Sequence, residues 1–230
     1  MKKAKKINNS EETLKKLKAF YVEYLQNVGA DTEITVSNRN SKMGEIPSVS
    51  LAPVITCANC AKCAKNCYAL HGRFCFSSAQ KSLAKNTAMA KCYPQSYWNQ
   101  VNKAVSLSRF FRFHVAGDFI SYDYFRHVVD IATLNPHCKI LAFTKQYQMV
   151  NDWIDSYGCL PENLQIIFSR WEGMPCQNRH NLPESHVITP NMDSLPKEWK
   201  ICGGDCSACA SNNCGCWTLD NGEHIAFYQH

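Results

Sequence analysis

Strand-like and helix-like segments alternate through the middle of this chain, and this alternation limits the folds that it can adopt. The strand-like runs are short and apolar, and the helix-like segments repeat their apolar residues at helical spacing. The strand-like runs cover residues 109–117, 139–145, 163–170 and 186–190, and the helix-like segments cover residues 122–135 and 147–158. Such alternation is typical of βαβ units and a parallel sheet. We therefore predict an α/β protein with a partial (βα) barrel-like parallel sheet and a cysteine-rich C-terminal segment.

The flanking segments predict further helices. An amphipathic helix is expected within residues 8–29, where Asn9 and Glu12 have the spacing of a capping box. Residues 76–107 have helical spacing interrupted at Pro94, which predicts two consecutive helices because proline is tolerated in a first turn. The expected layout is a basic tail and helix (1–44), an α/β body with the first cysteine loop (45–200) and a cysteine-rich segment packed on the body (201–230).

Each of the predicted central strands ends in polar side chains. In parallel α/β sheets the ligand lies at the carboxyl ends of the strands, so these side chains should line one pocket. The first cysteine loop should lie at the same edge, because it also follows a strand-like run. The candidate catalytic residues are His114, Asp118, Lys145 and Arg170, and the candidate cofactor contacts at the strand ends are Thr144 and Ser169.

These residues also have structural interpretations that the sequence leaves open. His114 lies in an apolar run and fits a hydrogen-bonded core histidine. Asp118 precedes a predicted helix and fits a helix cap. Lys145 and Arg170 fit ordinary surface charge, or they hold an anionic ligand beside the cysteine loop.

Composition indicates a globular protein of 230 residues with 14 cysteines and a formal net charge of +6. No run of about 18 apolar residues is present to span a bilayer, so no membrane partner is expected. The basic start lacks the apolar stretch of a signal peptide, which predicts a cytoplasmic protein. Cytosolic thiols stay reduced, so the cysteines favour metal or cluster ligation over disulfides. A solvated basic tail is favoured over a nucleic-acid arm.

The first cysteine group has the spacing C-x2-C-x2-C-x3-C, formed by Cys57, Cys60, Cys63 and Cys67. This spacing matches the cluster-binding run of bacterial ferredoxins, although Tyr68 replaces the proline that usually follows. In ferredoxins with two clusters, the fourth cysteine of such a run serves the other cluster, so a second set of ligands is expected.

The second cysteine group lies near the C-terminus and can supply that set. Its members are Cys202, Cys206, Cys209, Cys214 and Cys216. The two groups hold one cysteine more than two four-cysteine clusters need, so Cys60, Cys214 or Cys216 is a spare. Zinc is the alternative, but structural zinc sites usually join two cysteine pairs within one compact hairpin. The remaining cysteines are expected to be buried small apolar residues: Cys75, Cys92, Cys138, Cys159 and Cys176.

Several of these motifs together resemble the phage-type gene product 88 family. The resemblance rests on SLAPVITCANCAKCAKNCYALHGRF, RFFRFHVAGDFISYDYF, LAFTKQ and the C-terminal CGCW. It implies no particular reaction. A weaker likeness joins the chain to radical S-adenosylmethionine enzymes, and it implies a cofactor contact at Gly117. Those enzymes carry C-x3-C-x2-C in the first loop, whereas this loop has the reverse order.

We therefore expect an iron–sulfur protein with one or two [4Fe-4S] clusters facing a pocket at the strand ends. Its expected role is electron transfer to a bound small molecule or redox chemistry at the cluster, which favours an enzyme over a simple carrier. The electron donor would be a protein such as a ferredoxin or flavodoxin. Two alternatives stay open: a zinc protein that binds nucleic acid, and a radical enzyme that uses S-adenosylmethionine.

Overall fold

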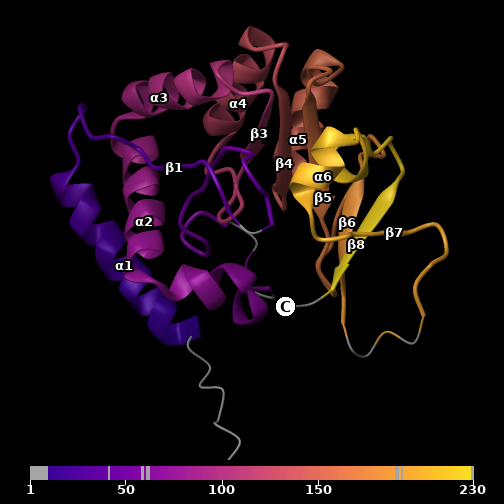
Figure 1. The fold of residues 1–230 in the computed structure, drawn as a ribbon, viewed down its shortest axis with the longest axis horizontal. Coiled ribbons are helices and arrows are strands. Elements are labelled where there is room, and N and C mark those ends of the chain that lie inside the picture. The colour runs from indigo at the N-terminus through magenta and orange to yellow at the C-terminus, as the bar shows by residue number, and fades with distance from the viewer. Residues whose placement is uncertain are drawn as a thin grey trace, which may run out of the picture.

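The computed structural model describes residues 10–40, 42–57, 60, 63–189, 192 and 194–228. Its centre is a single mixed β-sheet (Figure 1). The sheet has eight strands in the order β1-β2-β3-β4-β5-β6-β8-β7. Only the β1–β2 pair is antiparallel, and all the other pairs are parallel. The strands are β1 (Val36–Ser37), β2 (Ser48–Val49), β3 (Phe110–Phe113), β4 (Lys139–Thr144), β5 (Leu164–Ser169), β6 (Glu184–Ile188), β7 (Lys200–Ile201) and β8 (His224–Tyr228). The predicted parallel α/β architecture is confirmed.

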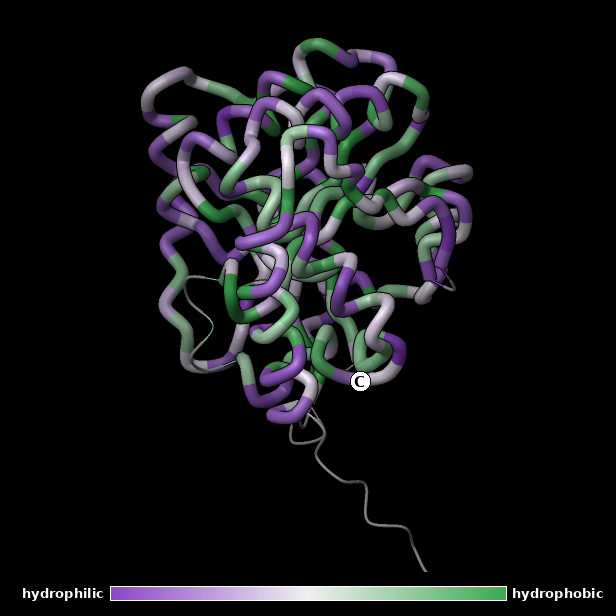
Figure 2. Tube along the Cα trace, turned by 90° about the vertical axis from the view of Figure 1, so that its left-hand side faces the viewer, coloured by the Kyte–Doolittle hydropathy of each residue, from purple (hydrophilic) through white to green (hydrophobic). Residues whose placement is uncertain are grey.

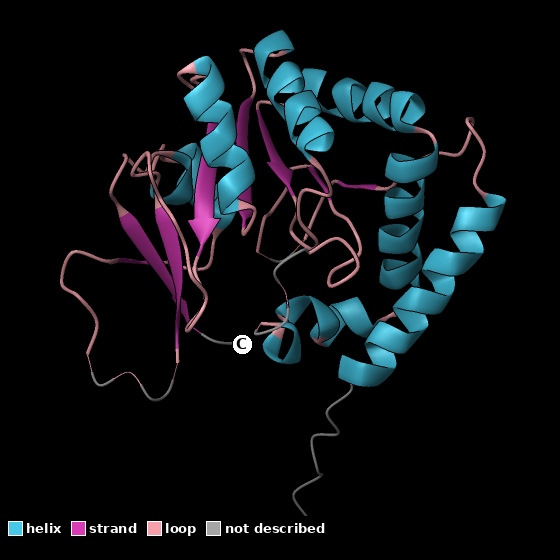
Figure 3. Cartoon of the chain, turned by 180° about the vertical axis from the view of Figure 1, so that it is seen from behind, coloured by secondary structure: helices cyan, strands magenta, loops and turns pink. Residues whose placement is uncertain are grey.

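One face of the sheet is covered by helices, as the view from behind shows (Figure 3). The main core lies between this face and the helices, and it contains Phe111 and Phe113 of β3 together with Tyr97, Phe125 and Val150 of three helices. The covering helices are α2 (Ser77–Cys92), α3 (Pro94–Ser106), α4 (Tyr122–Leu134) and α5 (Tyr147–Tyr157). Helix α1 (Ser10–Asn27) lies against α2, outside this layer (Figures 1 and 3).

The other face of the sheet is covered by the cysteine-rich C-terminal segment. This segment contains α6 (Cys206–Ser211) and a 3-10 turn, η4 (Gly215–Trp217). Trp217 and Leu219 pack there against Leu141 of β4 and Ile167 of β5. Apolar stretches gather toward the centre of the molecule, where the sheet lies (Figure 2).

The sequence-based elements are largely confirmed, including the helix break at Pro94, which begins α3. Asn9 of the predicted capping box and the lysines of the basic tail lie outside the described residues. Helix α6 and the two-residue strand β7 had no signal in the sequence. Within the described part of the chain, no helix is both long and apolar enough to cross a membrane.

Candidate functional site

A cavity of about 270 Å³ lies at the carboxyl ends of the central strands, where the sequence places the predicted pocket. The loop after β2 contains three 3-10 turns, η1 (Ala64–Asn66), η2 (Tyr68–Leu70) and η3 (Gly72–Cys75), and residues of η1 and η2 line one side of the cavity. The strand ends and the cysteine loop therefore share one edge of the sheet. The predicted site residues that line the cavity are Cys57, Cys63, Cys67, His114, Gly117, Asp118, Thr144, Lys145 and Ser169.

The cysteine loop is fastened to the segment after β3. Thr56, which precedes Cys57, accepts a hydrogen bond from the backbone N–H of Asp118 at 3.1 Å. Gly117 has a φ of +84°, and a Cβ atom there would lie 2.8 Å from both Leu51 and Thr56. Only glycine allows the two backbones to approach this closely. The structure thus gives Gly117 a positioning role beside the cysteine loop.

The cysteines of the first group are partly buried, and their thiols interact electrostatically with one another. Burial and, to a lesser extent, the carboxyl group of Asp118 raise the pKa of Cys57 to about 12. Burial also raises the pKa of Cys63 and Cys67, whereas Lys145 lowers both. Cys67 interacts with the other cysteines of its own loop, so the four first-group thiols form one local set. A metal that binds there must displace the thiol protons.

The second cysteine group forms a separate set within the C-terminal segment that covers the other face of the sheet. Cys202, Cys206, Cys209 and Cys216 pack on the second core beside Trp217. Burial and, to a lesser extent, the neighbouring thiols of the other three raise the pKa of Cys216 to about 12. Cys214 is exposed.

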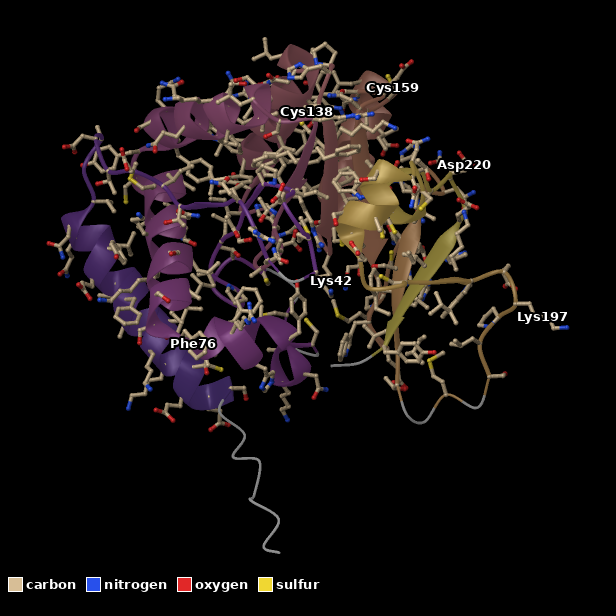
Figure 4. All side chains as sticks on the ribbon, in the orientation of Figure 1. Lys42, Phe76, Cys138, Cys159, Lys197 and Asp220 are labelled. Carbon is tan, nitrogen blue, oxygen red and sulfur yellow. The ribbon has the colours of Figure 1, made fainter. Side chains whose placement is uncertain are left out.

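Two features hold the second set in place. Gly215 has a φ of +62°, and a Cβ atom there would lie 2.9 Å from the Sγ atom of Cys209. The backbone N–H of Cys206 donates to the carbonyl of Lys42 at 2.9 Å, so Lys42 joins this set to the cavity that it also lines (Figure 4).

Tyr68 and Arg112 lie between the two sets. The Tyr68 hydroxyl donates to the carbonyl of Val115. Burial of this hydroxyl raises the pKa of Tyr68, Arg112 lowers it, and thiols of both sets raise it. Arg112 lies over the ring of Phe143 at 4.8 Å, and its Nε atom has no hydrogen-bond partner within the described structure. Arg112 was not among the site residues predicted from the sequence, although a cation within the apolar run FFRF was a usable signal.

Asp118 links two strand ends and does not cap a helix. Its carboxylate accepts from the Thr144 hydroxyl at 2.6 Å and from the backbone N–H of Lys145 at 2.8 Å. The cap of α4 is Ser121, whose side chain accepts from the N–H of Tyr124. The helix-cap interpretation of Asp118 is therefore wrong, because a nearer side chain already fills that position.

The two predicted cations occupy different surroundings. Lys145 donates from Nζ to the hydroxyl of Ser169 at 2.7 Å, within the cavity wall. Arg170 instead borders a neighbouring cavity of about 400 Å³. Its Nε atom lies 3.6 Å from Glu184. The structure thus separates Arg170 from the other candidate catalytic residues.

The isolated cysteines differ in burial. Cys138 is buried as expected, but Cys92 and Cys159 are exposed, so the burial predicted for these two is wrong. Cys92 ends helix α2, and Cys159 follows the last turn of α5. Cys138 and Cys159 lie at the end of the molecule opposite the cysteine loop (Figure 4). Cys75 and Cys176 are partly buried.

The spacing of the thiols bears on which metal they fit. Zinc–sulfur bonds of about 2.3 Å at tetrahedral angles place the sulfur atoms about 3.8 Å apart. Among the described residues, no three cysteine sulfurs lie within 4.8 Å of one another. A four-iron cluster attaches each thiolate to a different iron and needs wider spacing. As they stand, the described sulfurs of neither set are therefore close enough together to enclose a single zinc ion.

One family model, described as gene product 88, matches residues 5–224. No curated protein matches the chain. No solved structure matches it either. Nothing among these findings supports the likeness to radical S-adenosylmethionine enzymes.

Proposed function

The chain belongs to the gene product 88 family, and from this starting point we propose that it is an iron–sulfur protein with two [4Fe-4S] clusters. One cluster would face the cavity at the strand ends, and the other would lie in the C-terminal segment that covers the other face of the sheet. The activity we propose is one-electron reduction of a small molecule in the cavity, with the electron supplied by a donor protein such as a ferredoxin or flavodoxin.

The observation that carries this proposal is the position of the first cysteine set. Cys57, Cys63 and Cys67 line the same cavity as Lys145 and His114, at the carboxyl ends of parallel strands. Ligands of α/β proteins bind at this edge. A site that only stabilised the fold would not need its sulfurs in the wall of a cavity.

Each set supplies four thiols. Cys57, Cys60, Cys63 and Cys67 would hold the first cluster, and Cys202, Cys206, Cys209 and Cys216 would hold the second. We assign Cys214 as the spare: its thiol contacts that of Cys209, but Cys214 is exposed, whereas the other four members of its group pack on the second core. When bound, such clusters supply reversible one-electron transfer.

The protein's own cations suit this role. Four thiolates give a cluster site a negative charge, which nearby cations stabilise. Lys145, held by Ser169, lies close enough to lower the pKa of Cys63 and Cys67. Arg112 lowers the pKa of Cys206 in the second set. Each set therefore has a cation of its own beside it.

The first test is metal analysis of protein purified without oxygen. We expect a brown protein that contains about eight irons and eight sulfides per chain, as two four-iron clusters require. Stoichiometric zinc with no sulfide would instead support the zinc alternative, and it would overturn the proposal. Cleavage of added S-adenosylmethionine under reductant would support the radical-enzyme alternative.

Single cysteine variants then separate the two sets. Cys63→Ser and Cys216→Ser should each lose roughly half of the iron, and the double variant should lose nearly all of it. The Cys214→Ser variant should contain as much iron as the wild-type protein. Cys159→Ser is the matched control, because this cysteine is exposed and remote from both sets. Full iron in Cys63→Ser or Cys216→Ser would contradict the assignment of that ligand.

A further inference from the structure

We propose that Glu184, His186 and His224 form a separate site for one divalent first-row transition-metal ion. Glu184 and His186 lie two residues apart on β6, so their side chains point to the same face of the sheet. Glu184 is the register partner of His224 on the neighbouring strand β8. Strand pairing alone brings the three side chains together. The site contains no cysteine and does not depend on the clusters proposed above.

The distances between the ligand atoms suit one ion. His186 Nε2 and His224 Nδ1 are 3.0 Å apart. Glu184 Oε2 lies 3.7 Å from His186 Nε2 and 3.9 Å from His224 Nδ1. Bonds of about 2.1 Å at angles between 90° and 109° place ligand atoms about 3.0 to 3.4 Å apart. A shift of a few tenths of an ångström would therefore close the site around a metal ion.

The surroundings hold the ligands in position. Asn178 donates to Glu184 Oε1 at 3.0 Å, which leaves Oε2 directed at the two imidazoles. The ring of Trp199 stacks on His186 with centroids 3.8 Å apart. In known metal sites, contacts of this kind between neighbouring residues and the ligating side chains orient the ligands. Two imidazoles and one carboxylate also form the ligand set of many non-haem iron sites.

Room for further ligands lies next to the site. His186 lines both the strand-end cavity and the neighbouring cavity, whose wall also includes Trp171, Met174 and Trp199. Three protein ligands beside a cavity leave coordination positions open, as in catalytic rather than structural metal sites. The ion would thus accept a small molecule that coordinates through oxygen or nitrogen.

A metal-free explanation uses the same atoms. One histidine donates a hydrogen bond to the other, and Arg170 forms an ion pair with Glu184 Oε2 at 3.6 Å. This separation exceeds hydrogen-bond length, so Oε2 retains capacity for an ion. The positive charge of Arg170 nevertheless competes with a metal cation. Removing that charge distinguishes the two explanations, because it strengthens only the binding of a cation.

The test uses Mn²⁺, which prefers oxygen and nitrogen ligands and binds thiolates poorly. Full-length protein, purified without oxygen, is titrated with Mn²⁺ while the electron paramagnetic resonance signal of free Mn²⁺ is followed. We expect one ion per chain. His186→Ala and His224→Gln should each weaken Mn²⁺ binding by about 10-fold or more. In known sites, the loss of a residue that only contacts a metal ligand already lowers metal affinity by that much. Arg170→Met should bind more tightly.

His180→Ala is the matched control, because His180 contacts Asp155 at 2.7 Å on the surface and is expected to leave Mn²⁺ affinity unchanged. Circular dichroism checks that each variant is folded. Two outcomes would overturn the proposal: no binding by the wild-type protein at about 1 mM Mn²⁺, or wild-type affinity in both His186→Ala and folded His224→Gln. Neither outcome bears on the iron and sulfide counts, so the cluster proposal stands or fails separately.

Discussion

At the scale of single residues, His114 combines deep burial with an unusual backbone. It is 3% exposed, and its Nε2 atom lies 3.0 Å from the hydroxyl of Tyr124. Its Nδ1 atom has no partner among the described residues, and its φ is +55°. His114 is therefore a hydrogen-bonded core histidine that also lines the cavity, and its role as a site residue stays a prediction.

The pH dependence of stability should report this burial. Burial and, to a lesser extent, Arg112 lower the pKa of His114 to about 3. Because the unfolded chain binds this proton near pH 6.5, the group's contribution to stability is complete above that pH and is lost as the pH falls toward 3. The loss should reach ~1.4 kcal/mol per pH unit within this window.

His114→Asn removes the ionisable group and keeps a residue that tolerates positive φ. Urea unfolding of both proteins at pH 7.5, 6.5 and 5.5 should show the stability gap between them narrowing as the pH falls. Effects of other buried groups, such as Asp118, cancel in this difference. A constant gap would show that His114 gains a proton in the folded protein.

Gly117 should be intolerant of any side chain. Gly117→Ala adds a Cβ atom 2.8 Å from Leu51 and Thr56 at a strained φ of +84°, and we expect a loss of about 1–3 kcal/mol with reduced iron content. Gly158→Ala is the matched control, because Gly158 has the same φ and open space around it. Thermal unfolding measures the difference. Equal losses in the two variants would remove the steric argument.

At the scale of elements, the junction between the cysteine loop and the segment after β3 positions the cysteine loop at the cavity. Thr56 Oγ1 donates to the carbonyl of Ala52 at 2.9 Å and accepts from the N–H of Asp118. Asp118 in turn binds the end of β4 through Thr144. A short hydrogen-bonded chain thus links the cysteine loop to two strand ends.

Thr56→Val should break this chain while keeping the shape of the side chain. The N–H of Asp118 is left buried without its partner, which costs ~1–3 kcal/mol. Hydrogen exchange at residues 51–57 should become faster, whereas the core of α4 should be unchanged. Thr133→Val is the control, because its hydroxyl only donates to a carbonyl within its own helix. Unchanged exchange in residues 51–57 would argue against the link.

Elements with local signals were predictable from the sequence, and elements stabilised from a distance were not. Helices α4 and α5 have their own apolar periodicity, and Pro94 marks a helix start by its chemistry. Helix α6 has only six residues and is held by Trp217 and the second core. The trio of Glu184, His186 and His224 was missed because strand register, which joins β6 to β8, cannot be deduced from spacing along the chain.

At the scale of the whole molecule, the two faces of the sheet differ in what stabilises them. The helical face has a large continuous core that includes Phe111, Phe125 and Phe168. The face covered by the C-terminal segment has a smaller core, and the partly buried cysteines of the second set pack against it. Small cores commonly need an additional constraint such as a metal. We therefore expect the two faces to depend differently on metal.

Removal of metal should loosen the C-terminal segment and leave the α/β body folded. Chelator treatment without oxygen removes the proposed clusters, and binding energy lost from a metal site is lost from the structure around it. Limited proteolysis should then cut within residues 201–217, while far-ultraviolet circular dichroism stays close to that of the loaded protein, because the helices of the body pack on the other core. Cys214→Ser, predicted to keep both clusters, should resist the protease as the wild type does before chelation. Cuts spread through α3 to α5 would show instead that the metal stabilises the whole sheet, and an unchanged digest would show that the second set stabilises nothing.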